Sequence, residues 1–200
     1  MPSLPPIPLA GIRRPRHALL SLATALAACG SGESALAPAP GTNTVQLSAA
    51  AALGEKIFRD PGLSASGRQS CASCHDPDNA HAPANALAGQ PGGALLDQQG
   101  GRQAPSIRYL DTNRAFRFDD EGTPTGGFFW DGRAASLQQQ AGEPFLNPRE
   151  MANPGKAEVV AKLARASYEA EFRALYGNEV FAAVDAAVQR MTLALPQYPL

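Results

Sequence analysis

The sequence predicts an all-α fold with long loops, on the basis of three observations. Apolar residues recur at helical spacing in one segment before residue 60 and in three segments after residue 155. Alternating patterns that would indicate strands are weak. The 200 residues include 19 glycines and 18 prolines, well above the average share, so loops should be abundant between the helices. A hydrophobic content of 44% is enough for one ordinary core.

The charge balance excludes some classes of protein. The chain has 17 basic and 18 acidic residues, and its net charge is −1. Nucleic-acid binders usually carry a basic excess, so we expect no nucleic-acid partner. The balance also argues against a charged, disordered tail. No apolar run reaches the roughly 18–20 residues of a membrane-spanning helix.

Residues 1–28 have the layout of a secretory signal peptide. A basic cluster at residues 13–16 precedes a short apolar run at residues 18–28. The run ends in LAAC, which resembles the lipobox of bacterial lipoproteins and implies a lipid on Cys29. The alternative is an ordinary signal peptide in which Cys29 happens to lie near the cut. We therefore expect a periplasmic protein that is anchored to a bacterial membrane by its lipid.

The folded part is expected to follow a tether. Residues 29–46 are rich in Gly, Ser, Ala and Pro and lack apolar periodicity, which predicts a flexible linker. The domain itself is then expected at residues 47–200. Its first helix would begin after an N-cap at Ser48 and end at the Asp-Pro-Gly of residues 60–62.

The pattern CASCH at residues 71–75 is the most informative motif. Cys71 and Cys74 lie three residues apart, so their thiols could add to the two vinyl groups of one porphyrin. The adjacent His75 would then supply an imidazole nitrogen to the iron. Sequences of the form C-x-x-C-H mark covalent attachment of c-type haem, and the predicted export agrees with this reading. The motif therefore predicts one covalent haem c.

Paired cysteines can also bind zinc or form a redox-active pair. A zinc site needs further ligands at suitable spacing, but only His17, in the predicted signal peptide, and His81 remain. A thioredoxin-like redox pair would sit in a βαβ pattern, which the sequence lacks. If haem is attached, Cys29 carries lipid and the other two cysteines form thioethers, so no disulfide is expected.

Three amphipathic helices are predicted in the C-terminal part. They cover residues 156–165, 168–176 and 178–195. In the middle helix, Ser167 is the expected N-cap, Phe172 and Leu175 are expected to point inward, and Gly177 is the expected stop. Pro196 ends the last helix.

Several blocks of sequence resemble one known family. LGEKIFRDPGLSASGRQSCASCHDP, GRQAPSIRYL and FFWDGRAASLQQQAGEPFLNPREM look like the N-terminal domain of bacterial di-haem cytochrome c peroxidases. The same resemblance covers the related MauG-like enzymes, and it runs from about Leu53 to at least Ala152. It implies a cytochrome c-like haem domain with long loops around the porphyrin.

The resemblance implies roles for individual residues. It makes His75 the proximal ligand of the peroxide-reacting haem, and it makes Trp130 an electron relay. It places Gln140 and Glu150 in the distal pocket, where a carboxylate moves a proton between the peroxide oxygens and a neutral amide orients the substrate. Without the resemblance, Glu150 would be an ordinary surface carboxylate and Trp130 a core anchor. Arg133 is a candidate contact for a haem propionate.

Two departures from the family pattern change expectations. Some members have a second histidine about twenty residues after the motif, where this chain has Leu95, so we expect an open or water-bound sixth position on the iron. His81 is interpreted as a local loop residue and not as a ligand. Family members often have an asparagine that binds calcium where this chain has Gln103, so calcium is doubtful.

The expected function is therefore peroxide reduction with electrons from a small redox protein, either a cytochrome or a cupredoxin. The chain has no second C-x-x-C-H, and reducing peroxide to water takes two electrons, so we expect a fragment or a natural truncation. One alternative is a mono-haem electron carrier, for which Met151 and Met191 are candidate axial ligands. Another is a MauG-like oxidase of a protein side chain.

Overall fold

The structure of the protein, a computed structural model, describes residues 46–198. The predicted signal peptide, the lipidation site Cys29 and almost all of the predicted tether lie outside the described residues. Within residues 46–198, no helix is long and apolar enough to cross a membrane.

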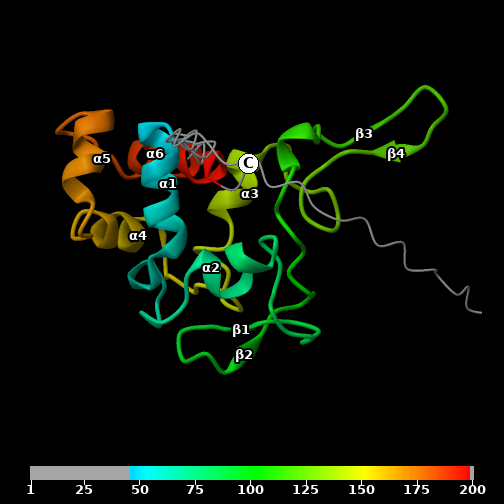
Figure 1. Ribbon diagram of the computed structural model, residues 1–200, viewed down its shortest axis with the longest axis horizontal. Coiled ribbons are helices and arrows are strands. Elements are labelled where there is room, and N and C mark those ends of the chain that lie inside the picture. The colour runs from blue at the N-terminus through cyan, green and yellow to red at the C-terminus, as the bar shows by residue number, and fades with distance from the viewer. Residues whose placement is uncertain (1–45, 199–200) are drawn as a thin grey trace, which may run out of the picture. The chain divides into compact units, whose positions relative to one another are not determined.

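The described part is mostly helical and has little sheet (Figure 1). This roughly supports the predicted all-α fold. The α-helices are α1 (Ala49–Arg59), α2 (Cys71–Cys74), α3 (Leu137–Gly142), α4 (Lys156–Leu163), α5 (Glu169–Tyr176) and α6 (Val184–Ala194). Single 3₁₀ turns are η1 (Pro61–Leu63), η2 (Pro77–Asn79), η3 (Leu110–Thr112) and η4 (Leu195–Gln197). Between α2 and α3 the chain runs mostly as loops, in agreement with the glycine and proline content.

Two short antiparallel ladders interrupt these loops, and the sequence pattern did not predict them. Strand β1 (Pro91–Gly92) pairs with β2 (Gln98–Gln99), and β3 (Arg117–Phe118) pairs with β4 (Pro124–Thr125). Each strand has only two residues, too few for an alternating pattern to be visible in the sequence. Figure 1 shows the β3–β4 hairpin extending away from the helices.

Helix α1 begins and ends where the sequence predicted. The Ser48 hydroxyl accepts a hydrogen bond from the Ala51 amide at 3.1 Å, which satisfies one of the unpaired donors of the first turn. The helix ends at Arg59, and the Asp60 carboxylate then caps η1 by accepting from the Gly62 amide at 2.7 Å. Pro61 cannot continue the helix because it lacks an amide hydrogen.

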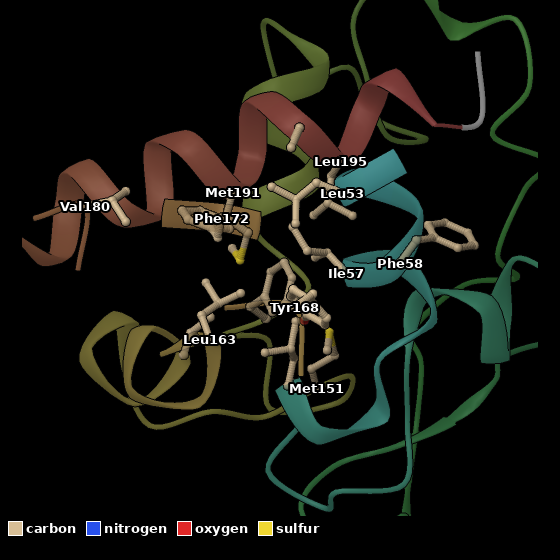
Figure 2. Close-up of a cluster of buried hydrophobic side chains, with 14 residues drawn as sticks. Leu53, Ile57, Phe58, Met151, Leu163, Tyr168, Phe172, Val180, Met191 and Leu195 are labelled. Carbon is tan, nitrogen blue, oxygen red and sulfur yellow. The ribbon is translucent and has the colours of Figure 1, made fainter. Parts of the chain in front are cut away.

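The hydrophobic core lies between α1, α4, α5 and α6 (Figure 2). Its largest fully buried side chains are Phe145, Phe172, Leu53, Ile57, Leu63, Leu163 and Met191. Figure 2 shows Phe58 on the other side of α1 from Leu53 and Ile57. Helix α1 therefore buries Leu53 and Ile57 on one side and Phe58, which belongs to the same hydrophobic cluster, on the other.

The structure corrects three predictions for the C-terminal helices. Ser167 is not the N-cap of α5, because Tyr168 holds that position while its phenol donates to Asp60 Oδ2 at 2.7 Å. Leu175 is 38% exposed and does not point inward, since this short helix buries a narrow face through Phe172. Helix α6 begins at Val184, six residues later than predicted, after a run of turns. Gly177 ends α5, as predicted, with a positive φ of 97° that glycine adopts without steric cost.

Candidate functional site

The CASCH motif forms a single helical turn with its cysteines on one side. The turn is closed locally, because Ser70 N donates to the Ser73 hydroxyl at 3.0 Å and His75 N donates to the Cys71 carbonyl at 2.9 Å. Residues three apart on a helix share a face, so Cys71 and Cys74 both reach the same cavity. Cys71 and Cys74 form no disulfide.

The ring of His75 is oriented by main-chain carbonyls. Its Nδ1 lies 3.0 Å from Pro105 O and 3.3 Å from His81 O. Carbonyl oxygens only accept hydrogen bonds, so Nδ1 carries the proton and Nε2 keeps its lone pair. Burial lowers the pKa of His75 and so favours the neutral ring. A neutral imidazole with a free Nε2 is the form that binds iron.

A cavity of about 410 Å³ lies beside this turn. Apolar side chains line much of it, namely Phe58, Ile107, Leu110, Phe129, Leu137, Met151 and Leu195. The Gln69 side chain also lines the cavity. Only 4% of this residue is exposed to solvent, and its Oε1 has no hydrogen-bond partner. A buried acceptor without a partner indicates that another group normally fills the space. The two thiols, the free Nε2 and the apolar walls fit a covalently attached haem.

The other predicted site residues lie in the wall of the same cavity. Trp130, Gln140 and Glu150 all line it, although they are separated from the cysteines by more than fifty residues. Trp130 remains 63% exposed, and its indole donates to Gln103 O at 2.9 Å. The structure therefore brings every predicted site residue of the described part into one place.

Glu150 is held by both its side chain and its main chain. Asn147 Nδ2 donates to Glu150 Oε1 at 2.9 Å, and Glu150 O accepts from the Gly93 amide at 2.8 Å. Burial raises the pKa of Glu150, while the nearby Arg133 charge and the Asn147 hydrogen bond oppose that rise. The carboxyl group therefore titrates above its ordinary range, which suits a group that takes and returns a proton.

Arg133 also lines the cavity but is engaged with neighbouring acids. Its guanidinium donates to Asp131 Oδ1 at 2.8 Å and to Glu143 Oε2 at 3.1 Å. It also stacks over the Phe129 ring, with 3.8 Å to the ring centroid. These contacts fix the guanidinium at the cavity edge, and its contact with a propionate stays a prediction.

The thiols do not have the properties of a reactive redox pair. Burial, with a smaller contribution from neighbouring Cys74, raises the pKa of Cys71 to about 12. Burial also raises the pKa of Cys74. Thioredoxin-like cysteines need a lowered pKa to act as thiolates, so this environment argues against that alternative. Among residues 46–198 there is no cluster of three or more His, Cys, Asp or Glu side chains that could hold a metal ion.

Sequence reasoning missed two residues that shape the cavity. Gln69 gave no signal, because nothing in GRQS indicates a buried amide, yet its Nε2 donates to Pro91 O at 3.0 Å and lies 3.8 Å from Cys74 Sγ. Asn147 could have been found, because Asn-Pro marks a turn. Its Oδ1 accepts from the Arg149 amide at 3.0 Å, so this turn sets the direction of Glu150.

His81 and the two candidate methionines occupy different environments. His81 lies in a loop, as predicted, but it is buried and does not line the cavity. Met191 is buried in the core and does not line the cavity, whereas Met151 is buried and lines it. Of the two methionines, therefore, only Met151 stays a candidate axial ligand.

A helical fold with a C-x-x-C-H turn in the wall of its cavity is typical of c-type cytochrome domains, and this is the class of protein to which the chain belongs. The family model described as di-haem cytochrome c peroxidase matches residues 48–200. The chain therefore belongs to the di-haem cytochrome c peroxidase family, whose named relatives include peroxidases and MauG proteins. This confirms the resemblance stated from the sequence blocks.

Individual relatives give the same result. The chain is 44% identical over 154 residues to methylamine utilization protein MauG of Paracoccus denitrificans (strain Pd 1222), covering 75% of this chain and 40% of that protein. It is 30% identical over 153 residues to cytochrome c551 peroxidase of Nitrosomonas europaea, covering 74% and 38%. The crystal structure of the diheme peroxidase BthA from Burkholderia thailandensis E264 matches with a TM-score of 0.70 and 34% identity, covering 77% and 39%. The chain thus spans about 40% of the length of these relatives.

Proposed function

We propose that this chain is a peroxidatic domain: it holds one covalent haem c and reduces hydrogen peroxide with electrons from a small redox protein. One observation carries the proposal, namely that Cys71, Cys74 and His75 share a cavity with Trp130, Gln140 and Glu150. When bound, the haem would supply the redox chemistry that cleaves the oxygen–oxygen bond. Cys71 and Cys74 would hold it through thioethers, and His75 Nε2 would be the iron ligand.

Glu150 is proposed to move the proton that peroxide cleavage requires. Its carboxylate would take a proton from one peroxide oxygen and return it to the other, so that the departing oxygen leaves as water. Asn147 keeps one carboxylate oxygen in place for both transfers. Gln140 would orient the peroxide, because an amide can donate and accept hydrogen bonds without competing for that proton.

Trp130 is proposed as the route by which electrons enter the cavity. It lines the cavity while 63% of the residue is exposed to solvent, so it links the inside of the site to the surface. The hydrogen bond to Gln103 O fixes the plane of the indole. A small cytochrome or cupredoxin would be the source of the electrons that this ring relays.

The decisive experiment uses the mature protein made with competent haem-attachment machinery. We expect a Soret band, a mass increase equal to one haem, and a high-spin ferric spectrum that changes when hydrogen peroxide is added. Absence of both the band and the mass increase would remove the haem proposal. A low-spin spectrum that peroxide does not change would instead support the mono-haem electron carrier, for which Met151 is the methionine that lines the cavity.

The similarity to MauG supports a second candidate, an oxidase of a protein side chain. The two candidates share the cavity and differ in where the electrons come from. Stopped-flow mixing with peroxide and a reduced small cytochrome or cupredoxin separates them. Rapid oxidation of the small donor supports the peroxidase, and peroxide reactivity without donor oxidation supports the protein oxidase.

Export and lipid anchoring are proposed from residues 1–29 alone, on the basis of the basic cluster, the short apolar run and the LAAC sequence. Processing that globomycin blocks would support a lipid on Cys29. Processing that is insensitive to globomycin would favour the ordinary signal peptide.

A further inference from the structure

The side chain of His81 is buried in an aromatic cluster next to the haem-attachment turn. Only 5% of the residue is exposed. Its ring packs edge-on against Phe58, with 5.6 Å between centroids, and against Tyr198, with 5.7 Å. Its Nδ1 accepts from Arg108 Nε at 3.3 Å, so the proton of the neutral ring is on Nε2, which is buried and has no partner. Buried polar atoms usually have a hydrogen-bond partner, so the unpartnered Nε2 of His81 calls for an explanation.

The backbone around His81 is also unusual. Ala80 and His81 both adopt left-handed conformations, with φ of 54° and 53°. Residues with a Cβ rarely occupy this region, and two in succession need a surrounding structure that holds them. The His81 amide donates to Asp76 O at 2.8 Å. The contacts of the His81 ring with Phe58 and Tyr198 hold the side chain of this turn in place.

This turn carries one of the two carbonyls that face the His75 ring. His81 O lies 3.3 Å from His75 Nδ1, beside Pro105 O at 3.0 Å. The two acceptor segments are joined, because the Ser106 hydroxyl donates to Ala80 O at 2.7 Å. A displacement of the His81 turn would therefore move both acceptors relative to His75.

We infer that His81 is a positioning residue: its ring, packed between Phe58 and Tyr198, anchors the turn that sets the hydrogen bonding of His75 Nδ1. Hydrogen bonds from the outer nitrogen of a ligating histidine raise its basicity and fix its orientation. A more basic imidazole stabilises the oxidised iron, so the anchor keeps the reduction potential low. The inference rests on the proposed attachment of haem to Cys71, Cys74 and His75.

Two substitutions separate the ring from the backbone conformation. His81→Asn keeps a residue that tolerates the left-handed region but removes the ring. His81→Phe keeps the ring, and the chain itself accepts phenylalanine in this conformation at Phe129, with φ of 65°. Tyr109→Asn is the matched control, because Tyr109 is also aromatic and left-handed, with φ of 62°, but is 74% exposed.

The readouts are the reduction potential of the haem and the iron–histidine stretching frequency of the ferrous protein, measured by resonance Raman spectroscopy. We expect His81→Asn to shift the potential to a more positive value and to lower the stretching frequency. His81→Phe and Tyr109→Asn should match the unsubstituted protein in both. Neither readout depends on peroxidase activity.

Unchanged values in His81→Asn would overturn the inference, and so would an equal shift in His81→Phe. If His81→Asn yields no folded haem protein, the same two readouts are measured in Tyr198→Leu, which removes one of the rings that His81 packs against. A shift of the same sign in Tyr198→Leu supports the inference, and no shift overturns it. Failure of haem attachment in the unsubstituted protein would instead refute the proposed function, and the absent Soret band distinguishes that case.

Discussion

At the scale of single residues, Glu150 combines burial with fixed hydrogen bonding. Its carboxyl group lies in the cavity wall, and Asn147 holds one oxygen. Burial raises its pKa above the ordinary value of 4.5. The protonated fraction therefore persists to higher pH than it would on the surface, while the ionised form is still reached as the pH increases.

We expect Glu150→Gln to slow the reaction with hydrogen peroxide at least about tenfold, because general acid–base help is lost. The rate of the unsubstituted protein should rise with pH as Glu150 ionises through its raised pKa, since the carboxylate is the base. The substituted protein should lose this rise. Stopped-flow absorbance across a pH series measures both effects.

Glu143→Gln is the control for that experiment. Glu143 is a nearby carboxylate that pairs with Arg133 but does not line the cavity. Its substitution should keep both the rate and its rise with pH, and should move the rise to a slightly lower pH, because the Glu143 charge contributes to the raised pKa of Glu150. Equal rates in Glu150→Gln and the unsubstituted protein would remove Glu150 from the mechanism.

At the scale of elements, strand β1 packs directly against the turn at residues 147–150, which carries Glu150 and is called the Glu150 turn below. A side chain on Gly92 would overlap the main-chain oxygen of Arg149 and crowd the Cα atom of Glu150. Gly93 N then donates to Glu150 O at 2.8 Å. The close approach requires a residue without a Cβ, which explains glycine at this position.

Gly92→Ala is expected to lower the free energy of unfolding by about 1–3 kcal/mol, the usual cost of forcing extra atoms into packed structure. The peroxide reaction should slow as well, because the Glu150 turn is displaced. Gly101→Ala is the stability control, since no atom lies within 4 Å of its added Cβ. Urea unfolding of the haem proteins measures the difference, and equal stability of the two variants would contradict the packing argument.

Helix α5 allows a second test of which face is buried. Phe172 is completely buried and stacks on Phe181 with 5.2 Å between ring centroids, whereas Leu175 is 38% exposed. Phe172→Ala should lower the free energy of unfolding by about 3–5 kcal/mol. Leu175→Ala should change it by about 0.5 kcal/mol, as for most surface positions. Similar losses at both positions, measured by urea unfolding, would show that the helix is rotated relative to this structure.

At the scale of the whole molecule, the haem is expected to complete the core. The cavity of about 410 Å³ adjoins the main cluster, and Phe58, Met151 and Leu195 belong to both. At about 24 cal/mol per Å³, an enclosed void of that size would cost ~10 kcal/mol. Water entry reduces this cost, but a loss of several kcal/mol is large for a domain whose total stability is about 5–15 kcal/mol.

The haem-free protein should therefore unfold at a much lower temperature. We expect the double variant Cys71→Ala/Cys74→Ala, checked for the absence of a Soret band, to have a Tm at least about 10 °C below that of the haem protein. Circular dichroism melting curves of the two proteins measure the difference. Equal melting temperatures would mean that the cavity is not part of the folded core.

The sequence by itself determined the local features of this protein. The spacing of CASCH predicted haem attachment, and the Ser48 cap and Asp-Pro-Gly stop predicted the limits of α1, because these signals act within a few residues of each other. The family blocks identified Trp130, Gln140 and Glu150, although their roles stay proposals. Ser167 and Leu175 were misassigned, because helical spacing alone does not say which face a short helix buries.

Only the tertiary structure decided which distant groups meet. The burial of Gln69 and the seating of Glu150 against β1 depend on contacts between segments far apart in the chain. The partners of His75 Nδ1 are main-chain carbonyls, and every residue has one, so no sequence pattern could reveal them. The same holds for His81, whose aromatic neighbours come from α1 and from Tyr198. The haem motif could be read from the sequence because it is local, and its surroundings could not because packing assembles them.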